Sequence, residues 1–445
     1  MPGPPAERGG GEPGPEGPHQ LHWLTVPLRV LLVTTVMFAV VGVLLLELEP
    51  DLGPVLTMAV TLLFIGATGA VCLADWWTHT YELSGDHLLL RRGLVHHVER
   101  EVPLSRLQTV DTVCPLLVRV LGLAEVRIEL AGGDRSEVRL AYLSRYEADR
   151  LRSALIAHAA GLPGGTPPPE DRPLFVLGTP MLLTALVAQL PVLVAFGGLL
   201  VLAVVGLAFR EPAVLGAVIP LALGLIRGFL GPLLRYGGFR AAVAPDGLRL
   251  RFGLVQRRDQ TVPPGRVHAV RVVEPLLWQL LGLARLDANI AGHVGERQMD
   301  SATLLPVVPR RLAFELTHHL LPGVDPGRAQ LVPARGLRGR TAELGVTETA
   351  LVARSGVLCR TAVIVAHSAV QSIRLASGPV ERWLGRVSLV VETVPGPVRL
   401  HAPARGVREG WRVLARVSSG VDRGRMRGHG PERWVTRTDR WPVRN

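Results

Sequence analysis

The sequence of 445 residues contains no lysine, so all 49 of its basic residues are arginine. It has only three cysteines, Cys72, Cys114 and Cys359, and this odd number without CxxC spacing excludes a disulfide framework and a zinc site. We therefore expect the soluble parts to face a reducing compartment. Only 19% of the residues are charged against 48% hydrophobic, and the mean hydropathy is +0.30. Such an apolar chain excludes disorder throughout and predicts membrane-spanning segments.

Recognisable catalytic motifs are also missing. The sequence has no HExxH, no GxSxG, no phosphate-binding GxxxxGK[ST] and no glycine-rich dinucleotide fingerprint after a strand. Small groups of histidine and acidic residues occur around His96 and around His318, but chance and surface exposure explain their spacing. We therefore expect no enzyme, no cofactor and no metal ion.

The net charge of +12 is typical of a protein that lies against an anionic surface, either membrane lipid or nucleic acid. The apolar excess favours the membrane. The expected partners are therefore membrane lipid and either another membrane protein or a second copy of this chain. We expect no binding to nucleic acid.

Two apolar segments near the N-terminus predict a membrane hairpin. Val26 to Leu46 and Pro54 to Ala74 have 21 residues each, and at 1.5 Å per residue each would cover roughly 30 Å as a helix. The turn from Glu47 to Asp51 is acidic and lacks arginine, whereas Arg29 and Arg91 lie on the other side of the segments. Because arginine-rich flanks stay inside, we expect both ends of the hairpin in the cytoplasm.

A second apolar block, Leu174 to Phe209, contains 36 uncharged residues, about 54 Å if helical and too long for one crossing. We expect Leu174 to Gln189 to be an interfacial or steeply tilted segment and Leu190 to Phe209 to span the membrane. Pro212 to Leu234 would then return as the fourth span. If both halves of the long block crossed, the chain would have five spans.

Arg227 lies inside the fourth predicted span, about two turns from its end. The favoured interpretation is that its side chain snorkels toward the cytoplasmic headgroups. The alternative is a functional charge inside the membrane, where it would contact lipid or a partner.

The sequence outside the spans is repeated. Gly93 to Gly132 aligns without a gap on Gly253 to Gly292, with 17 of 40 positions identical at an offset of 160. A third copy begins at Gly356, at an offset of 263 from the first, and is the most diverged: it has Ala369 where the others have arginine and Gly378 where they have proline. Each copy predicts strands first and a helix last.

Several residues of the first two copies carry a recognisable pattern: Gly93, Pro103, Arg106, Pro115 and Leu121 to Leu123, then Gly253, Pro263, Arg266, Pro275 and Leu281 to Leu283. Placed after a two-span hairpin, this pattern resembles the bacterial PH-like domain family of YdbS and YdbT type, and the layout is similar to the longer YdbT type. The resemblance implies a bent antiparallel sheet or split barrel closed by a C-terminal helix. It implies little about activity.

The expected fold class is therefore membrane α-helical hairpins plus α+β soluble units, with four transmembrane helices and three PH-like repeats. The predicted boundaries are a disordered tail 1–20, hairpin 21–76, PH-like repeat 1 at 77–160, linker 161–173, interfacial segment and second hairpin 174–235, repeat 2 at 236–322, linker 323–340, repeat 3 at 341–417 and a basic disordered tail 418–445.

Candidate contacts are the equivalent Arg106 and Arg266, together with two tryptophans of the C-terminal tail. The favoured role of the arginines is a structural one, as an ion pair or a cap on a nearby carbonyl; the alternative is contact with anionic lipid or a partner. Trp434 and Trp441 lie among tail arginines and would either rest on anionic phospholipid or belong to a solvated end.

These observations predict a non-enzymatic protein of the cell membrane, multi-pass, with both termini and all PH-like repeats in the cytoplasm. It would present the repeats as a scaffold or binding platform for partner proteins or lipid, with a part in envelope homeostasis. The alternative is a four-span component of a transport or export system that the repeats gate or recruit. Convergent polar groups inside the hairpins would favour transport, and an apolar bundle would favour a scaffold.

Overall fold

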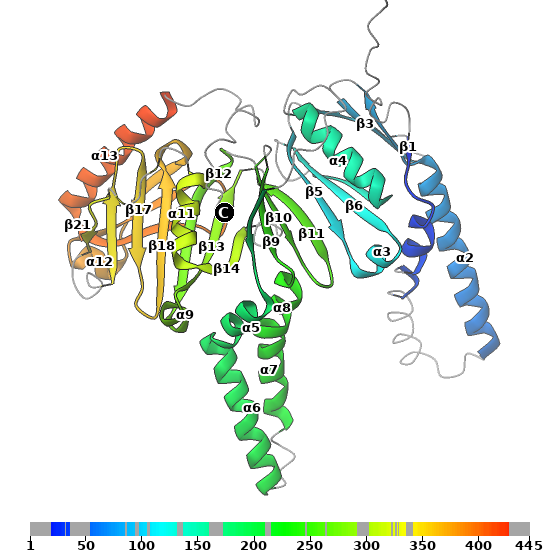
Figure 1. Cartoon of the computed structure of the whole chain (residues 1–445), viewed down its shortest axis with the longest axis horizontal. Helices are drawn as coiled ribbons and strands as arrows, with labels where there is room; N and C mark the ends of the chain where they lie inside the picture. Colours follow the sequence, from blue (N-terminus) through cyan, green and yellow to red (C-terminus); the bar gives the residue numbers. More distant parts are fainter. Residues whose placement is uncertain are drawn as a thin grey trace, which may run out of the picture. The chain divides into compact units, whose positions relative to one another are not determined.

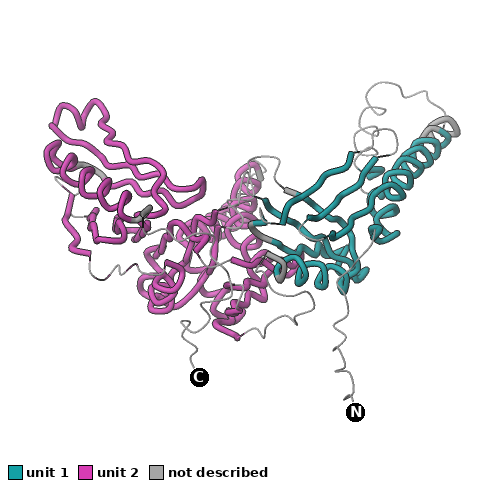
Figure 2. The backbone as a smooth tube through the Cα atoms, turned by 90° about the horizontal axis from the view of Figure 1, so that it is seen from above, with its two compact units in different colours: residues 1–131, 136–168 teal, residues 132–135, 169–445 magenta. Residues whose placement is uncertain are grey.

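The computed structural model describes residues 19–31, 33–35, 54–84, 87–93, 98–104, 107–130, 137–159, 172–209, 215–244, 247–262, 265–291, 302–321, 324, 327, 329–334 and 341–426. The chain divides into two compact units (Figure 2). Unit 1 comprises residues 1–131 and 136–168, and unit 2 comprises residues 132–135 and 169–445.

Unit 1 joins a long helix to antiparallel strands that a second helix closes. Residues 25–31 and 33–35 are helical, and the elements that follow are β1 (His19–Gln20), α2 (Pro54–Thr78), β2 (Thr80–Ser84), β3 (His87–Arg92), β4 (Val98–Pro103), β5 (Leu107–Cys114), α3 (Leu116–Val120), β6 (Leu123–Leu130), β7 (Glu137–Ser144) and α4 (Arg145–Ala159). One sheet has the order β1-β2-β3-β4, and β6 pairs with both β5 and β7.

The start of α4 follows from its sequence. Glu147 N–H donates to Ser144 Oγ at 3.2 Å, and Ser144 N–H donates to Glu147 Oε2 at 3.1 Å. This reciprocal pair is the capping box that the spacing of Ser144 and Glu147 predicts, because it satisfies two N–H groups that have no partner within the helix.

Unit 2 contains the second membrane hairpin and two repeated segments (Figure 1). Its elements are β8 (Arg172–Val176), α5 (Thr179–Val187), α6 (Leu190–Phe209), α7 (Leu215–Leu225), the π-helix η3 (Ile226–Leu230), α8 (Gly231–Tyr236), β9 (Arg240–Ala244), β10 (Gly247–Phe252), β11 (Arg257–Val262), β12 (Val267–Pro275), α9 (Leu276–Leu281), β13 (Leu283–Ile290), β14 (Thr303–Pro309), α11 (Arg310–Leu320), β15 (Val332–Pro333), β16 (Ala342–Val346), β17 (Ala350–Ser355), β18 (Cys359–Ala366), the 3₁₀-helix η6 (His367–Ala369), β19 (Ser372–Ala376), α12 (Pro379–Trp383), β20 (Arg386–Glu392), β21 (Leu400–Gly406) and α13 (Val407–Met426).

One antiparallel sheet joins the second and third repeats. Its order is β14-β13-β12-β18-β17-β16-β15, and β12 of repeat 2 pairs with β18 of repeat 3 from Ala269↔Val365 to Pro275↔Cys359. Side chains of both repeats, such as Val272 and Ile364, share one buried core. Repeat 2 is therefore not a closed body by itself, because separating it from repeat 3 would expose the edge of β12.

Equivalent glycines give the repeats the same turns. In each repeat, the φ angle is positive at one glycine after the second strand: Gly93 (116°), Gly253 (108°) and Gly356 (91°). It is also positive at one glycine after the short helix: Gly122 (72°), Gly282 (64°) and Gly385 (61°). L-residues rarely adopt these angles. These φ angles agree with the register of the sequence alignment, also at the two glycines of the expected third repeat.

The turn at Gly253 admits no side chain. A Cβ there would lie 2.0 Å from the carbonyl oxygen of Gln256, whereas a Cβ at Gly238, whose φ is also positive, would have nothing within 4 Å. We expect Gly253→Ala to destabilise the protein by about 2 kcal/mol or more and Gly238→Ala by only about 1 kcal/mol. Thermal unfolding of the purified full chain measures both, and equal losses would contradict this account.

Among the described residues, three helices are long and apolar enough to cross a membrane, over Thr61–Thr78, Leu190–Ala208 and Gly216–Tyr236. The predicted span Leu190 to Phe209 coincides with α6. The predicted return segment corresponds to α7, η3 and α8. For the predicted span Val26 to Leu46, only residues up to 35 lie in the described part of the chain, so the number of four spans stays a prediction.

The structure differs from the sequence-based expectation at Leu174 to Gln189. Leu174 belongs to β8, which pairs with β9, and the short helix α5 follows. Leu182, Ala185 and Leu186 of α5 are buried in the core with the strands of repeat 2. Because α5 is only nine residues long, about 14 Å, it is too short to cross. The apolar run belongs partly to the core of unit 2, which excludes α5 as a fifth span.

The C-terminal helix is longer than expected. α13 continues to Met426, nine residues beyond the predicted end at Val417, so the predicted disordered tail 418–445 begins inside a helix. Val417 and Val421 are both buried, which explains why the helix continues along the sheet. Residues 427–445 lie outside the described part of the chain.

Candidate functional site

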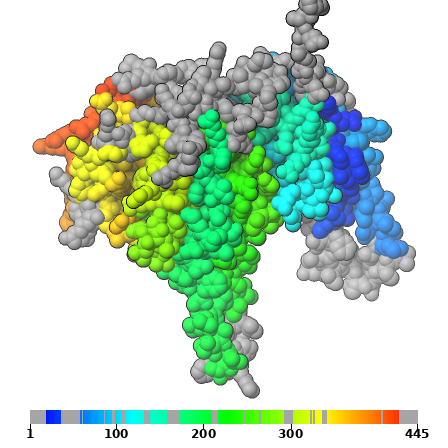
Figure 3. Space-filling model, viewed as in Figure 1, coloured from blue at the N-terminus to red at the C-terminus, as the bar shows by residue number. Residues whose placement is uncertain are grey.

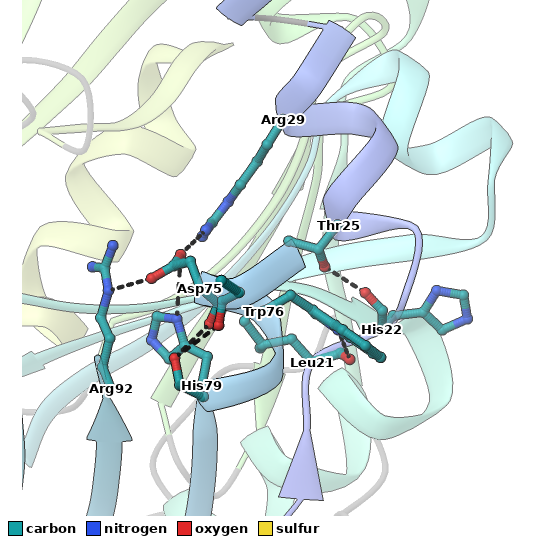
Figure 4. A network of polar contacts seen from close by, with 10 residues as sticks. Leu21, His22, Thr25, Arg29, Asp75, Trp76, His79 and Arg92 are labelled. Atoms are coloured by element: carbon teal, nitrogen blue, oxygen red, sulfur yellow. Dashed lines mark hydrogen bonds and ion pairs between the residues drawn. The ribbon is translucent and has the colours of Figure 1, made fainter. Parts of the chain in front are cut away.

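A carboxylate between two arginines lies where α2 ends (Figure 4). Asp75 is in the last turn of α2, and its Oδ1 lies 3.1 Å from Nε of Arg92, the last residue of β3. Arg29, from the helical residues 25–31, forms an ion pair with the other carboxylate oxygen through Nη1. One side chain thus connects the end of a membrane helix, the start of the N-terminal helix and the first sheet of unit 1.

Backbone contacts surround this cluster. Trp76 Nε1 donates to the carbonyl oxygen of Leu21 at 2.7 Å, and the N–H of His22 donates to the carbonyl oxygen of Tyr142 at 3.0 Å. Tyr142 has a φ of 62°, which is unusual for a residue with a side chain. The chain before the N-terminal helix is therefore held against both α2 and β7.

The electrostatics of the cluster indicate a structural junction. His79 Nδ1 lies 3.9 Å from Asp75 Oδ2, and burial, with the positive charge of Arg92 as the next cause, lowers the pKa of His79. His79 is therefore neutral near pH 7. Because two guanidinium groups already neutralise the carboxylate of Asp75, it is poorly suited to act as a general base. Among the described residues, no group of three or more His, Cys, Asp or Glu side chains could hold a metal ion.

The sequence-based search for sites missed Asp75. A signal for it exists, because Asp75 directly follows the uncharged run that ends at Ala74, while Arg29 lies near the start of the preceding apolar run. Antiparallel spans place those two ends at the same membrane surface. An acid and an arginine at such positions predict an ion pair.

Arg227 lies in η3, inside the apolar segment Gly216–Tyr236, and its side chain is exposed. Next to it, Gly228 allows close packing against α6: a Cβ on this residue would lie 3.0 Å from Cγ2 of Val192. Arg227 lies nine positions before Tyr236, about 14 Å along a helix. Snorkelling and a functional charge both stay open, and the contact of Arg227 with lipid or a partner stays a prediction.

Arg266 lies just before β12 and is half-buried. Its carbonyl oxygen accepts a hydrogen bond from Ala291 N–H at 2.8 Å. Burial lowers the pKa of His268, and the charge of Arg266 lowers it further. The equivalent Ala369 of repeat 3 is buried, so this turn forms without an arginine. The other predicted contacts, Arg106, Trp434 and Trp441, lie outside the described residues.

Replacing Arg266 separates the two roles considered for it. In a structural role, Arg266→Ala lowers the free energy of unfolding by about 1 to 3 kcal/mol, because a buried acceptor loses a charged donor. In a lipid contact, stability is nearly unchanged and binding to anionic lipid weakens in a salt-dependent way. We expect the structural outcome. The test requires the full chain, because repeat 2 shares its sheet with repeat 3.

Comparison with known proteins identifies similar sequences. The model of the family described as "Bacterial PH domain" matches residues 32–159, 185–324 and 325–421. The UPF0699 transmembrane protein YdbT of Bacillus subtilis (strain 168) is 23% identical over 299 residues, and the match covers 59% of each chain. The chain therefore spans less than two thirds of the length of this curated relative.

Proposed function

Because the chain belongs to the bacterial PH domain family and carries helices apolar enough to cross a membrane, we propose that it is a multi-pass membrane scaffold. Three PH-like repeats and four spans would place a binding platform for partner proteins or lipid at the cytoplasmic face. The matched family is not a known enzyme family.

The direct continuation of a membrane helix into a sheet supports this proposal most. α8 ends at Tyr236 and β9 begins at Arg240, so only three residues separate them. Gly237 N–H bonds to the carbonyl oxygen of Leu233, and Leu254 N–H of the β10–β11 turn bonds to that of Leu234 at 2.8 Å. A sheet fixed this closely to a membrane helix holds its surfaces at a constant position relative to the bilayer, as a platform requires.

The interior of the second hairpin favours a scaffold over a transporter. Phe196 of α6 and Phe229 of η3 pack edge to face with ring centroids 6.0 Å apart. A Cβ on Gly198 would lie 3.1 Å from a methyl carbon of Leu221, which shows how closely α6 and α7 approach. These contacts are apolar, whereas carriers place several acidic or histidine groups at depth.

Purification of the tagged full chain from native membranes tests the proposal. We expect a protein or a lipid class to co-purify with the full chain in near-stoichiometric amount. The same chain in sealed vesicles should not carry solute. A chain that purifies without partner or enriched lipid, and that permits solute flux in vesicles, would favour the transport alternative.

A further inference from the structure

The two repeats of unit 2 expose apolar side chains at equivalent positions of their short helices. On α9, Leu280 is 81% exposed, and on α12 the equivalent Trp383, at an offset of 103, is 86% exposed. The next residues, Leu281 and Leu384, are equivalent and exposed as well. These side chains are not needed for the core, because Trp278 alone anchors α9 there and is 3% exposed.

In each of the two repeats, a turn between two strands carries further exposed apolar side chains. Leu254 and Val255 follow β10, and Val357 and Leu358 follow β17 at the same offset of 103. All four side chains are exposed. The membrane edge is defined here as these four turn residues together with Leu276, Leu280, Leu281, Val380, Trp383 and Leu384.

Hydrogen bonds connect α9 and the turn at Leu254 to the elements at both ends of the hairpin. Trp278 Nε1 donates to the carbonyl oxygen of Ala185 in α5, directly before α6, at 2.8 Å. The N–H of Leu254 donates to the carbonyl oxygen of Leu234 in α8 at 2.8 Å. Gln279 Nε2 of α9 donates to the carbonyl oxygen of Val357 at 3.3 Å, so the turn of repeat 3 lies beside the helix of repeat 2.

The membrane edge lies on the side of unit 2 from which the hairpin projects. α9 and α12 lie on the side from which α6 and α7 project (Figure 1), and the space-filling view shows the hairpin leaving the body on that side (Figure 3). Arg360 and Arg382 are exposed next to the apolar side chains. Apolar side chains flanked by arginines are typical of protein surfaces that lie at the boundary of headgroups and acyl chains.

We propose that the membrane edge inserts into the leaflet that α6 enters, so that unit 2 lies on the bilayer instead of standing away from it. The occupant of this surface is the lipid of the same membrane, because α9 and the turn at Leu254 are hydrogen-bonded to the elements at both ends of the spanning hairpin. The arginines would contact anionic headgroups. The inference rests on the proposed membrane anchoring, but not on the identity of any scaffold partner.

Spin labels test this insertion in the full chain. In a background without Cys72, Cys114 and Cys359, nitroxides are attached at Leu280→Cys and Trp383→Cys, and at Ser418→Cys on the exposed side of α13 as a matched control. The protein is reconstituted into vesicles of phosphatidylethanolamine and phosphatidylglycerol. Collision with oxygen, which concentrates in acyl chains, is compared with collision with a water-soluble nickel chelate.

For the labels at 280 and 383, we expect oxygen accessibility to exceed nickel accessibility, with a ratio several-fold higher than at 418. Labels at 280 and 383 that collide with nickel as readily as the control would show that the edge lies in water. Labels shielded from both reagents would show that a second copy of the chain covers the edge. Either result overturns the proposal, and neither affects the scaffold function, which the co-purification experiment tests separately.

Discussion

Replacing Asp287 with alanine should lower the free energy of unfolding by about 3 to 5 kcal/mol, because it leaves a partly buried arginine without its counter-ion. Asp287 is 2% exposed. Its Oδ2 lies 2.8 Å from Nη2 of Arg271, and its Oδ1 lies 3.1 Å from Nε of Arg285 and accepts a hydrogen bond from Thr303 Oγ1 at 3.1 Å. Thermal unfolding of the full chain in nanodiscs measures the loss.

Glu392→Ala is the matched control in the same unit. Glu392 pairs with Arg374 at 2.6 Å, but both side chains are largely exposed, so the expected loss is below about 1 kcal/mol. Losses of equal size for Asp287→Ala and Glu392→Ala would contradict the importance given to burial.

Repeat 1 provides a second control through its reversed charges. Arg271 and Asp287 face each other across β12 and β13, and the equivalent register pair in repeat 1 is Asp111 and Arg127. The double variant Arg271→Asp with Asp287→Arg should therefore recover a large part of the stability that Asp287→Arg alone removes. Failure to recover would mean that Arg285 and Thr303 determine the sign of the charge at this position.

The variant Asp75→Asn should destabilise unit 1 by about 2 to 3 kcal/mol, because two guanidinium groups lose a shared charged acceptor. The side chain of Asp75 is 22% exposed, so the expected loss is smaller than for Asp287. The matched control is Glu99→Gln, which breaks an exposed pair with Arg91 at 2.9 Å and should cost less than about 1 kcal/mol.

A double-mutant cycle assigns the effect of Asp75 to its partner. The combined variant Asp75→Asn with Arg29→Gln should lose less stability than the sum of the two single losses, by about 1 kcal/mol or more. Strict additivity would show that Arg29 and Asp75 do not interact in the folded protein.

The repeated architecture could be predicted from the sequence because backbone geometry restricts the residues at its turns. Gly253 and Gly356 have positive φ and equivalent neighbours, so their spacing was informative even where side chains had diverged. The same reasoning applies to Gly282 and Gly385, which end the short helices. The span Leu190 to Phe209 was predictable for a different reason, since its length and uniform hydrophobicity match a bilayer.

The features that sequence patterns missed depend on tertiary contacts. Hydrophobicity does not distinguish lipid from a protein core, so the pattern predicts an interfacial segment where Leu182 and Leu186 of α5 pack inside unit 2. The pairing of β12 with β18 joins residues about 90 positions apart, which no local pattern encodes. The ends of the two apolar runs predict the contact of Asp75 with Arg29, but its contact with Arg92 of β3 depends on the tertiary structure.

Cysteine labelling of intact cells tests the central claim most directly, namely that all PH-like repeats lie on the cytoplasmic side of the membrane. Single cysteines replace Ala160, the last residue of repeat 1, and Gln330, which follows repeat 2, in a background without the native cysteines. A membrane-impermeant maleimide should label both positions only after the membrane is opened. Labelling of either position from outside intact cells would contradict the account.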